Sequence, residues 1–399
     1  MTEALRVRSR NENETDKHSK QFTALPATQQ PPWPDPLEAS RILDRLSPEP
    51  LVESNAVGRL NRQLRAVQEG HALVLQIGDC VEDLRRSGIE EVARKIEFIE
   101  FARSVFEQRT DVDVLAVGRI AGQYTKPRSN DHEIVDGASL PIYRGPMVNS
   151  HERDATARIP SPDRIRACHE ASTGAMAAID RYNSGNPGRE IWTSHEMLLV
   201  DYELRYLLRT PEGNHLGTTH WPWIGERTRD LGGAHVAIAE TLTNPVSIKV
   251  GPQASPQDVI GLAERLNPQR VPGKLSFIAR MGIHLTSRLH PLVAEVRRQG
   301  HPVNWICDPM HGNTVTTRRG IKTRRVEHII AEVVGFNTVM SANGQVGAGL
   351  HLEATHENIY ECTSGDIEPD SGPRYTTLLD PRLNGEQLEQ VITSWHRDR

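Results

Sequence analysis

Ionisable side chains stand at the end of each of eight short apolar segments in this chain of 399 residues. The clearest example is VNWICDPMHGNT, in which a strand-like run stops at Asp308 and Pro309 and is followed at once by His311 and Gly312. An Asp-Pro pair favours a turn, and a glycine permits two backbones to approach closely. We therefore expect the strand to end here so that His311 points inward, with Asp308 as its hydrogen-bonding partner.

A first set of these residues combines soft and hard metal donors. A thiolate, an imidazole and two carboxylates suit Mn²⁺, Fe²⁺, Co²⁺ or Zn²⁺. The residues come from distant segments, so their spacing alone matches no metal motif, and an inert buried thiol is the alternative role for the cysteine. The candidate ligands are Cys80, His311, Glu353 and Asp380.

A second set is cationic. Arg presents a planar fork and Lys a point charge, and both suit phosphate and carboxylate groups. Converging cations repel one another unless an anion lies between them, so we expect a strongly anionic substrate, and two phosphorylated substrates fit this set. One charged residue at a strand end is usually a solvated loop edge, but eight such ends together favour a site. The candidates are Arg119, Lys126, Arg128, Arg227, Lys249 and Arg280.

The apolar segments that must position these residues alternate with helical patterns. Such alternation indicates βαβ units with a parallel sheet, and eight units indicate an α/β fold of the (β/α)8 barrel type. In this fold the active site lies at the carboxyl ends of the strands, where the ionisable residues stand. The expected strands are 72–80, 112–120, 190–198, 217–226, 245–252, 274–282, 303–312 and 348–355.

Two short regions are predicted to precede the barrel. Residues 1–35 are polar and Pro-rich, which is typical of a solvated, disordered tail, and we expect this tail to be accessory. Residues 36–70 are predicted to form a helical extension, and residues 71–399 the catalytic barrel.

Local signals predict helix boundaries within the barrel. Ser161 followed by Pro162 favours a helix start, and Ser255 with Asp258 favours a capping box. The stretch YELRYLLR is predicted to lie in one continuous helix.

Composition excludes several classes of protein. The residues are 37% hydrophobic and 25% charged, as in soluble globular proteins, and the net charge of -5 gives no electrostatic reason to expect nucleic acid or an anionic membrane as partner. No apolar run approaches the roughly 20 residues of a membrane span, and the first residues lack a secretory apolar core. Four widely spaced cysteines favour a reducing cytoplasm.

The motifs resemble those of one enzyme family, the type II 3-deoxy-D-arabino-heptulosonate 7-phosphate (DAHP) synthases. They follow the family order from about residue 26 to residue 390. The motifs are QIGDC, GRIAGQYTKPRS, LPIYRG, WTSHEMLLVDYE, WIGERTRDLGGAH, NPVSIKVGP, ARMG, CDPMHGNT, GLHLEAT and DPRLN. The short N-terminal region and the wording THWPWIGERTR are similar to the phenazine-pathway branch of the family, which implies a place in secondary metabolism.

The resemblance implies a (β/α)8 barrel that condenses phosphoenolpyruvate with erythrose 4-phosphate and releases phosphate, as the first step of the shikimate route to aromatic amino acids. The four candidate ligands match its metal ligands, with Mn²⁺ expected and Co²⁺, Fe²⁺ or Zn²⁺ as alternatives. The residues that match the phosphoenolpyruvate pocket are Arg119, Glu226, Arg227, Lys249 and Arg280. Those that match the aldose phosphate loop are Lys126, Pro127, Arg128 and Ser129. The residues expected to act in catalysis are Arg119, Lys126, Glu226, Lys249 and His311. A homodimer or higher homo-oligomer is expected.

Departures from the family pattern leave the second substrate open. Pro146 stands where an Asp is usual, and the residues after Arg280 lack a common Lys. A variant synthase for an amino- or otherwise modified aldose phosphate is therefore the alternative function. A non-catalytic regulatory partner is a further alternative, but its signature would be degraded ligands. Because the chain has little sequence outside the barrel, we expect weak or absent feedback inhibition by aromatic amino acids.

Overall fold

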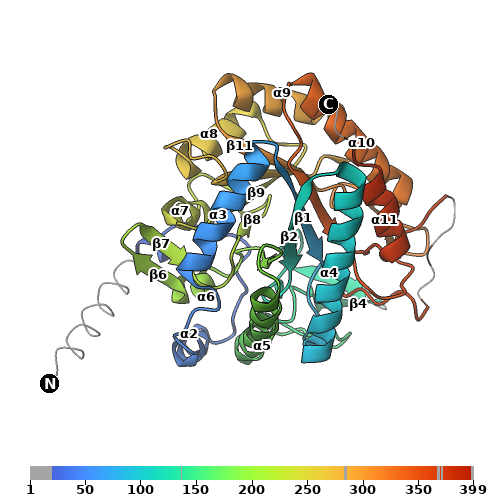
Figure 1. The fold of residues 1–399 in the computed structure, drawn as a ribbon. Coiled ribbons are helices and arrows are strands. Elements are labelled where there is room, and N and C mark those ends of the chain that lie inside the picture. Colours follow the sequence, from blue (N-terminus) through green and yellow to red (C-terminus); the bar gives the residue numbers. More distant parts are fainter. Residues whose placement is uncertain (1–19, 136, 283–284, 366–368, 370–371, 397–399) are drawn as a thin grey trace.

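Eight parallel strands form the central sheet of the protein (Figure 1). The computed structural model describes residues 20–396, except 136, 283–284, 366–368 and 370–371. The strand order in the sheet is β5-β2-β1-β14-β11-β10-β9-β8, and every neighbouring pair is parallel. The strands are β1 (Ala72–Gly78), β2 (Asp113–Arg119), β5 (Ile191–Thr193), β8 (Trp223–Ile224), β9 (Val246–Val250), β10 (Leu275–Ala279), β11 (Val303–Cys307) and β14 (Gly349–Glu353). All eight expected strands are confirmed.

The sheet closes on itself between its two outermost strands. Glu196, just after β5, forms a parallel bridge with Trp223 of β8. Backbone hydrogen bonds continue this contact, because Trp223 N donates to the carbonyl of His195 at 3.0 Å and Met197 N donates to Trp223 O at 2.9 Å. The fold is therefore the predicted (β/α)8 barrel.

Burial on both faces explains why these strands are visible in the sequence. The residues of β9, β10, β11 and β14 are all buried, as are the middle residues of β1. Strands covered on both sides give continuous apolar runs in place of an alternating pattern. The main hydrophobic core lies between these strands and the surrounding helices.

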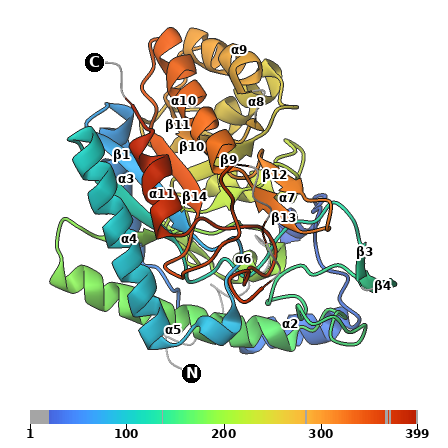
Figure 2. The ribbon, with the colours of Figure 1, turned by 90° about the vertical axis from the view of Figure 1, so that its right-hand side faces the viewer.

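The helices form an outer layer around the barrel (Figures 1 and 2). Consecutive members of this ring contact each other in the order α5, α4, α11, α10, α9, α8, α7. The described helices are α2 (Pro36–Arg45), α3 (Ser54–Gln68), η1 (Leu84–Arg86), α4 (Ile89–Thr110), α5 (Asp163–Gly185), α6 (Val200–Arg205), α7 (Ala234–Thr241), α8 (Pro256–Leu266), α9 (Leu285–Arg298), α10 (Val326–Ala342) and α11 (Gly385–Thr393). No helix among the residues described is long and apolar enough to cross a membrane.

One of three local predictions about helices is confirmed and two are wrong. The capping box of Ser255 and Asp258 is confirmed at the start of α8. The N-cap of α5 is Pro162, without a side-chain hydrogen bond, so the predicted cap at Ser161 is wrong by one residue. The continuous helix through YELRYLLR is also wrong, because α6 ends at Arg205 and the chain turns into a strand at Leu207.

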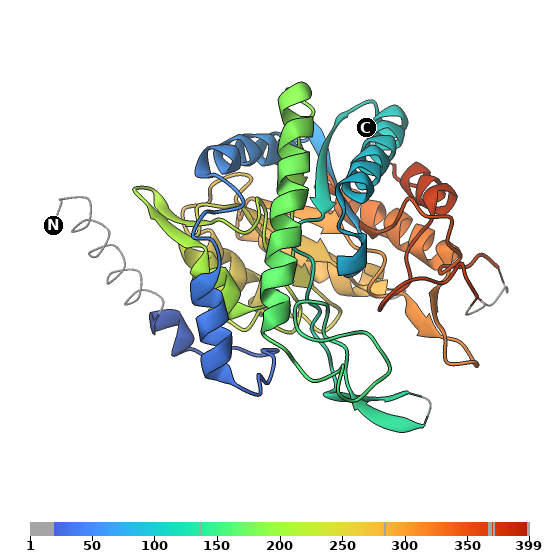
Figure 3. The ribbon, with the colours of Figure 1, turned by 90° about the horizontal axis from the view of Figure 1, so that it is seen from below.

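Three two-stranded antiparallel hairpins interrupt the alternation of strands and helices. The hairpin of β3 and β4 stands away from the barrel in Figures 2 and 3, and that of β12 and β13 lies in the loop after β11. The hairpin strands are β3 (His132–Val135), β4 (Ala138–Pro141), β6 (Leu207–Thr210), β7 (Gly213–Leu216), β12 (Thr314–Thr316) and β13 (Lys322–Arg324). Three or four residues per strand are too few to leave a periodic signal in the sequence.

Helix α3 covers the amino-terminal end of the barrel. Leu60 and Leu64 of this helix are fully buried in the main core. Asn304, near the start of β11, donates its side-chain amide to the carbonyl of Leu64 at 3.1 Å. Helix α2 lies instead beside α5, as Figure 3 shows. The predicted helical extension is therefore two helices with different packing partners, separated by residues 46–53.

The described part of the N-terminal tail, residues 20–35, packs against the barrel. Phe22 is 3% exposed and belongs to the main core. The carbonyl of Pro26 accepts a hydrogen bond from Ala234 N at 3.0 Å. The expectation of a solvated, disordered tail is thus wrong for these residues. Residues 1–19 lie outside the described part of the chain, and the domain boundaries at 35 and 70 stay a prediction.

Candidate active site

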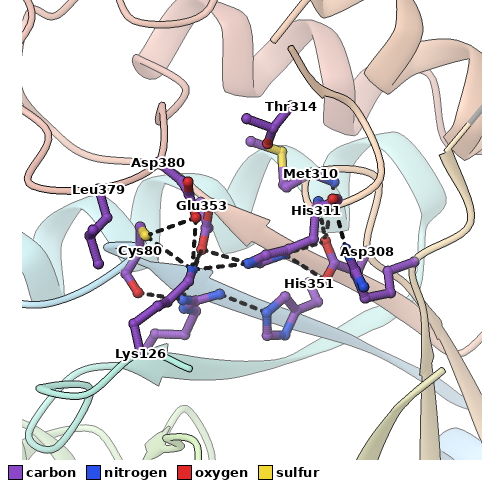
Figure 4. Close-up of polar contacts among 12 residues, drawn as sticks. Cys80, Lys126, Asp308, Met310, His311, Thr314, His351, Glu353, Leu379 and Asp380 are labelled. Carbon is purple, nitrogen blue, oxygen red and sulfur yellow. Dashed lines mark hydrogen bonds and ion pairs between the residues drawn. The ribbon is translucent and has the colours of Figure 1, made fainter. Parts of the chain in front are cut away.

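Four predicted metal ligands converge at the carboxyl end of the barrel (Figure 4). Cys80 follows β1, Glu353 is the last residue of β14, and His311 lies in the loop after β11. Asp380 comes from the long segment between β14 and α11. The Nε2 atom of His311 lies 2.9 Å from Oε1 of Glu353, and the thiol of Cys80 lies 3.6 Å from Oδ2 of Asp380. Distant segments therefore build one donor cluster.

The ammonium group of Lys126 lies in the middle of this cluster, as the dashed lines in Figure 4 show. Its Nζ is 3.0 Å from the sulfur of Cys80 and 3.2 Å from each nearest donor atom of the other three residues. A cation thus already sits among a thiol, an imidazole and two carboxylates. This arrangement has the donor chemistry of a divalent metal site.

The turn after β11 fixes the orientation of His311. Asp308 accepts a hydrogen bond from Nδ1 of His311 at 2.8 Å, so Nε2 keeps its lone pair toward the donor cluster. Gly312 makes the turn possible, since a Cβ at this position would lie 2.3 Å from the backbone nitrogen of Gly282. The predicted roles of Asp308 as hydrogen-bonding partner and of Gly312 in close packing are both confirmed.

Burial and neighbouring charges set the protonation of the donors. Burial and the charge of Glu353 raise the pKa of the Cys80 thiol to about 12, so it is a neutral thiol beside Lys126. Burial would also raise the pKa of Asp380, but Lys126 and Lys322 outweigh it and hold that pKa well below its ordinary value. A bound metal would remove the thiol proton, because the thiolate is the form that coordinates.

Arg324 is a member of the site that the sequence analysis missed. It lies on β13, is fully buried, and its Nη1 is 2.7 Å from Oε2 of Glu353. Burial would raise the pKa of Glu353, yet His311, Lys126 and Arg324 hold it well below its ordinary value. Arg324 therefore keeps one carboxylate oxygen occupied, and Oε1 of Glu353 faces the donor cluster.

Arg119 and Lys249 form a buried cationic pair next to the donors. Gly78 of β1 is in register with both Arg119 and Glu353, which places Nη2 of Arg119 3.1 Å from Oε1 of Glu353. The ammonium of Lys249 lies 2.5 Å from Oδ2 of Asp308. Both cations lie over the ring of Trp223, at 5.2 and 5.8 Å from its centroid.

His351 joins the two cations, and it too was missed. Its Nε2 lies 2.7 Å from Nη1 of Arg119 and 2.9 Å from Nζ of Lys249, so Nε2 accepts from both. Its Nδ1 donates to Oε1 of Gln76 at 2.6 Å. A usable signal was present in GLHLEAT, because His351 and Glu353 are two residues apart on one strand and therefore share a face.

The remaining predicted substrate residues lie around this pair. Nη2 of Arg280 donates to the carbonyl of His311 at 2.9 Å, and its Nε is buried without a partner. Nη2 of Arg227 donates to Oγ of Ser129 at 2.7 Å, which joins the predicted pocket to the predicted aldose phosphate loop. The guanidinium of Arg128 lies 3.9 Å from Glu133, on the β3 side of the loop and away from the donor cluster.

Two acids complete the site. Glu226 accepts from Gly251 N at 2.6 Å and pairs with Arg229 at 2.9 Å, so its carboxylate is held by the backbone beyond β9. Glu196 is buried, and its Oε1 has no hydrogen-bond partner. Burial raises the pKa of Glu196, although Lys126 and Lys249 oppose the rise. Glu196 lies in the expected strand 190–198, and the sequence analysis did not single it out.

Comparisons with known proteins place this site in a family context. The sequence model of the Class-II DAHP synthetase family matches residues 17–188 and 180–393. The chain is 40% identical over 391 residues to a probable phospho-2-dehydro-3-deoxyheptonate aldolase of Pseudomonas fluorescens, covering 94% of this chain and 96% of that protein. It is 35% identical over 435 residues to the phospho-2-dehydro-3-deoxyheptonate aldolase of Streptomyces coelicolor, covering 94% and 96%. A relative from Mycolicibacterium smegmatis is 35% identical over 424 residues, covering 91% and 90%.

Proposed function

The chain belongs to the Class-II DAHP synthetase family, and on this premise we propose that it condenses phosphoenolpyruvate with erythrose 4-phosphate in a metal-dependent reaction. The products are DAHP and inorganic phosphate. The observation that carries the proposal is the donor cluster around Lys126, with Arg119 and Lys249 beside it. Metal donors and anion-binding cations stand within one buried site, which is what two phosphorylated substrates and an aldehyde require.

The donor set fits a divalent metal. Cys80, His311, Glu353 and Asp380 would hold it, and when bound it would polarise the aldehyde carbonyl as a Lewis acid. We propose Mn²⁺, with Co²⁺, Fe²⁺ or Zn²⁺ as alternatives that the donors also accept. Asp308 keeps the ligating nitrogen of the imidazole free of a proton, through its hydrogen bond to the other ring nitrogen.

The buried cations hold phosphoenolpyruvate. Arg119, Lys249 and Arg280 supply guanidinium and ammonium donors to its phosphate and carboxylate. Arg119 and Lys249 are 2% and 5% exposed, so water competes little with the substrate for them. His351 keeps both groups in place by accepting from each. Their fixed orientation brings the nucleophilic carbon of the enol phosphate to the aldehyde.

The aldose phosphate is held by the loop of Lys126, Pro127, Arg128 and Ser129. In the reaction, C3 of phosphoenolpyruvate bonds to the aldehyde carbon and the former carbonyl oxygen takes a proton to become a hydroxyl. Water adds to the resulting cationic C2 and loses one proton, which balances the proton taken up by the aldehyde oxygen. The bond from C2 to the phosphate oxygen then breaks, the hydroxyl on C2 gives its proton to the departing phosphate, and C2 becomes a ketone. Glu226, Lys249 and His311 are the proposed groups that move protons at the site.

A phosphate-release assay tests metal dependence directly. Purified protein is assayed with phosphoenolpyruvate and erythrose 4-phosphate before and after chelation, and then after separate addition of Mn²⁺, Co²⁺, Fe²⁺ and Zn²⁺. We expect chelation to abolish phosphate release and one or more metals to restore it. Full activity in a protein shown by elemental analysis to contain no metal would refute the proposal.

A second candidate function is a synthase for a modified aldose phosphate. The departures at Pro146 and after Arg280 favour it, because they lie close in sequence to the segments assigned to the aldose phosphate and phosphoenolpyruvate. The two candidates are separated by comparing kcat/KM for erythrose 4-phosphate and for its imino analogue in the same assay. A preference for erythrose 4-phosphate rules out the second candidate.

We also propose that the enzyme feeds secondary metabolism, in the manner of the phenazine-pathway branch that THWPWIGERTR resembles. Deletion of the gene from its host should abolish an aromatic secondary product and leave growth without added aromatic amino acids intact. An aromatic auxotroph would contradict this proposal. The homo-oligomer expected from the family stays a prediction, and light scattering of the purified protein measures it.

A further inference from the structure

A segment of the N-terminal region crosses the carboxyl end of the barrel beside the candidate active site. We call residues 26–30, with the sequence PATQQ, the strap. Its last residue, Gln30, donates its amide to the carbonyl of Leu198 at 2.8 Å and accepts from the backbone nitrogen of Val200 at 3.0 Å. The strap is therefore anchored to the start of α6.

A second anchor lies at the other end of the strap. Pro26 accepts from the backbone nitrogen of Ala234 at 3.0 Å, at the start of α7. The hydroxyl of Thr28 donates to the carbonyl of Arg227 at 3.1 Å. The strap is thus fixed at both ends to the loops that follow β5 and β8, and one of these contacts is to a residue of the predicted phosphoenolpyruvate pocket.

Between the anchors, Gln29 reaches the predicted aldose phosphate loop. Its side-chain Oε1 accepts a hydrogen bond from the backbone nitrogen of Arg128 at 2.7 Å. Gln29 has a φ of 65°, in the left-handed region that a glutamine rarely adopts. A residue holds such a conformation when its surroundings determine it, and these conformations are common at functional sites.

We infer that Gln29 is a positioning residue for the aldose phosphate. Its hydrogen bond holds the backbone of the loop at Arg128, so that neighbouring Lys126 and Ser129 face the site together. Lys126 lies among the metal donors and Ser129 accepts from Arg227, so a shift of this backbone displaces both contacts. The inference rests on the proposed function, in which this loop binds the phosphate of the second substrate.

The test replaces the hydrogen-bond acceptor without changing the side-chain length. Gln29→Met removes Oε1, and we expect the KM for erythrose 4-phosphate to rise roughly 3- to 10-fold, the effect of one lost hydrogen bond. The KM for phosphoenolpyruvate should rise less, because Arg227 is the one residue of that pocket that the described contacts join to the strap and its loop, whereas Arg119, Lys249 and Arg280 have other partners. Hydrogen exchange of the amides in residues 126–129 should become faster in the same variant.

Conservative and matched variants separate positioning from general loosening. Gln29→Glu keeps the acceptor oxygen, so it should restore slow exchange at the Arg128 amide. Gln68→Met makes the same chemical change at the amino-terminal end of the barrel, where Gln68 donates to the carbonyl of Val303, and it should leave the KM for erythrose 4-phosphate unchanged. An equal rise in the KM values of both substrates for Gln29→Met would overturn the inference.

Arg128→Met distinguishes failure of the inference from failure of the proposed function. If this variant raises the KM for erythrose 4-phosphate and Gln29→Met does not, the strap has no positioning role and the loop assignment stands. If neither variant changes this KM, the assignment of the loop to the aldose phosphate is wrong, and the inference fails with it.

Discussion

Each end of the barrel holds a lysine with a lowered pKa, one buried and one half-buried, and the two have different partners. Lys249 on β9 lies at the carboxyl end, and Lys274 lies just before β10 at the amino-terminal end. Burial is the largest influence on both, and it lowers the pKa of each from its ordinary value to about 8. The shifted pKa therefore does not tell the two apart.

Their partners do tell them apart. The ammonium of Lys249 lies against the carboxylate of Asp308 and shares His351 with Arg119, so it belongs to a network of charges that a substrate can rearrange. The ammonium of Lys274 donates to the backbone carbonyls of Leu242 and Asn244, which have no other charge state. A perturbed pKa is a sign of function only where the surrounding groups can also change.

The largest loss of activity is expected from a substitution in the donor cluster at the carboxyl end of the barrel. Cys80→Ala removes the thiol, and we expect loss of bound metal and at least about a 1,000-fold fall in kcat, since the metal supplies several kcal/mol of transition-state stabilisation. Metal content and phosphate release measure both. Cys307→Ala is the matched control, because Cys307 is equally buried and outside the donor cluster. A Cys80→Ala protein with normal metal content and activity would refute the ligand assignment.

The next largest effect is expected when the same substitution is made at Lys249 and at Lys274 and kcat/KM is compared. Lys249→Met should lower kcat/KM by roughly 100- to 1,000-fold, as loss of one charged donor in a buried site does. Lys274→Met should leave kcat/KM within about twofold, because Lys274 contacts backbone at the opposite end of the barrel. Metal content should stay constant in both variants. Equal losses of activity in the two variants would contradict the assignment of Lys249, and not Lys274, to the active site.

A smaller effect is expected at Arg280. Arg280→Ala removes a guanidinium with a buried, unpartnered Nε, and the KM for phosphoenolpyruvate should rise roughly tenfold to 100-fold. The KM for the aldose phosphate should change less. Initial rates measured against each substrate give both constants. An unchanged KM for phosphoenolpyruvate would remove Arg280 from the pocket.

The smallest effect concerns stability and pH at the amino-terminal end. The pKa of Lys274 is lowered from 10.5 to about 8, so between these values the unfolded chain binds more protons than the folded one. The free energy of unfolding therefore has its full contribution from Lys274 above pH 10.5, and this contribution is lost as the pH falls from 10.5 through 8. Relative to Lys274→Met, the wild type should gain up to about 1.4 kcal/mol per pH unit in this window. Urea unfolding at pH 8, 9 and 10 measures the difference, and parallel curves would contradict it.

The sequence allowed the barrel to be predicted because its strands are buried on both faces and leave continuous apolar runs. Three of the four candidate ligands, Cys80, His311 and Glu353, were found for a related reason, since each lies at or near the place where such a run stops. Asp380 lies far beyond the end of β14, and its apposition to Cys80 depends on a segment whose described residues form no helix or strand. In the sequence, Asp380 was grouped with the other ligands only because a carboxylate suits a mixed set of metal donors and because the family resemblance includes it.

The residues that escaped prediction have no such local signal. Arg324 lies on a three-residue strand, and only the closed barrel brings it to Glu353. Gln29 lies in a polar, Pro-rich stretch whose composition is typical of a disordered tail, and its contact with Arg128 joins residues 99 apart in sequence. Contacts of this kind follow from the tertiary structure and from no pattern of neighbouring residues.

The barrel closes at a short contact between β5 and β8, the two outermost strands in the sheet order. Glu196 and Trp223 join there by a single bridge, and β8 is only two residues long. The same two residues supply an unpartnered acid beside the cations and the aromatic face beneath Arg119 and Lys249. Any parting of the strands at this contact would disturb the substrate pocket at once. Catalytic activity would therefore be lost while most of the hydrophobic core was still intact.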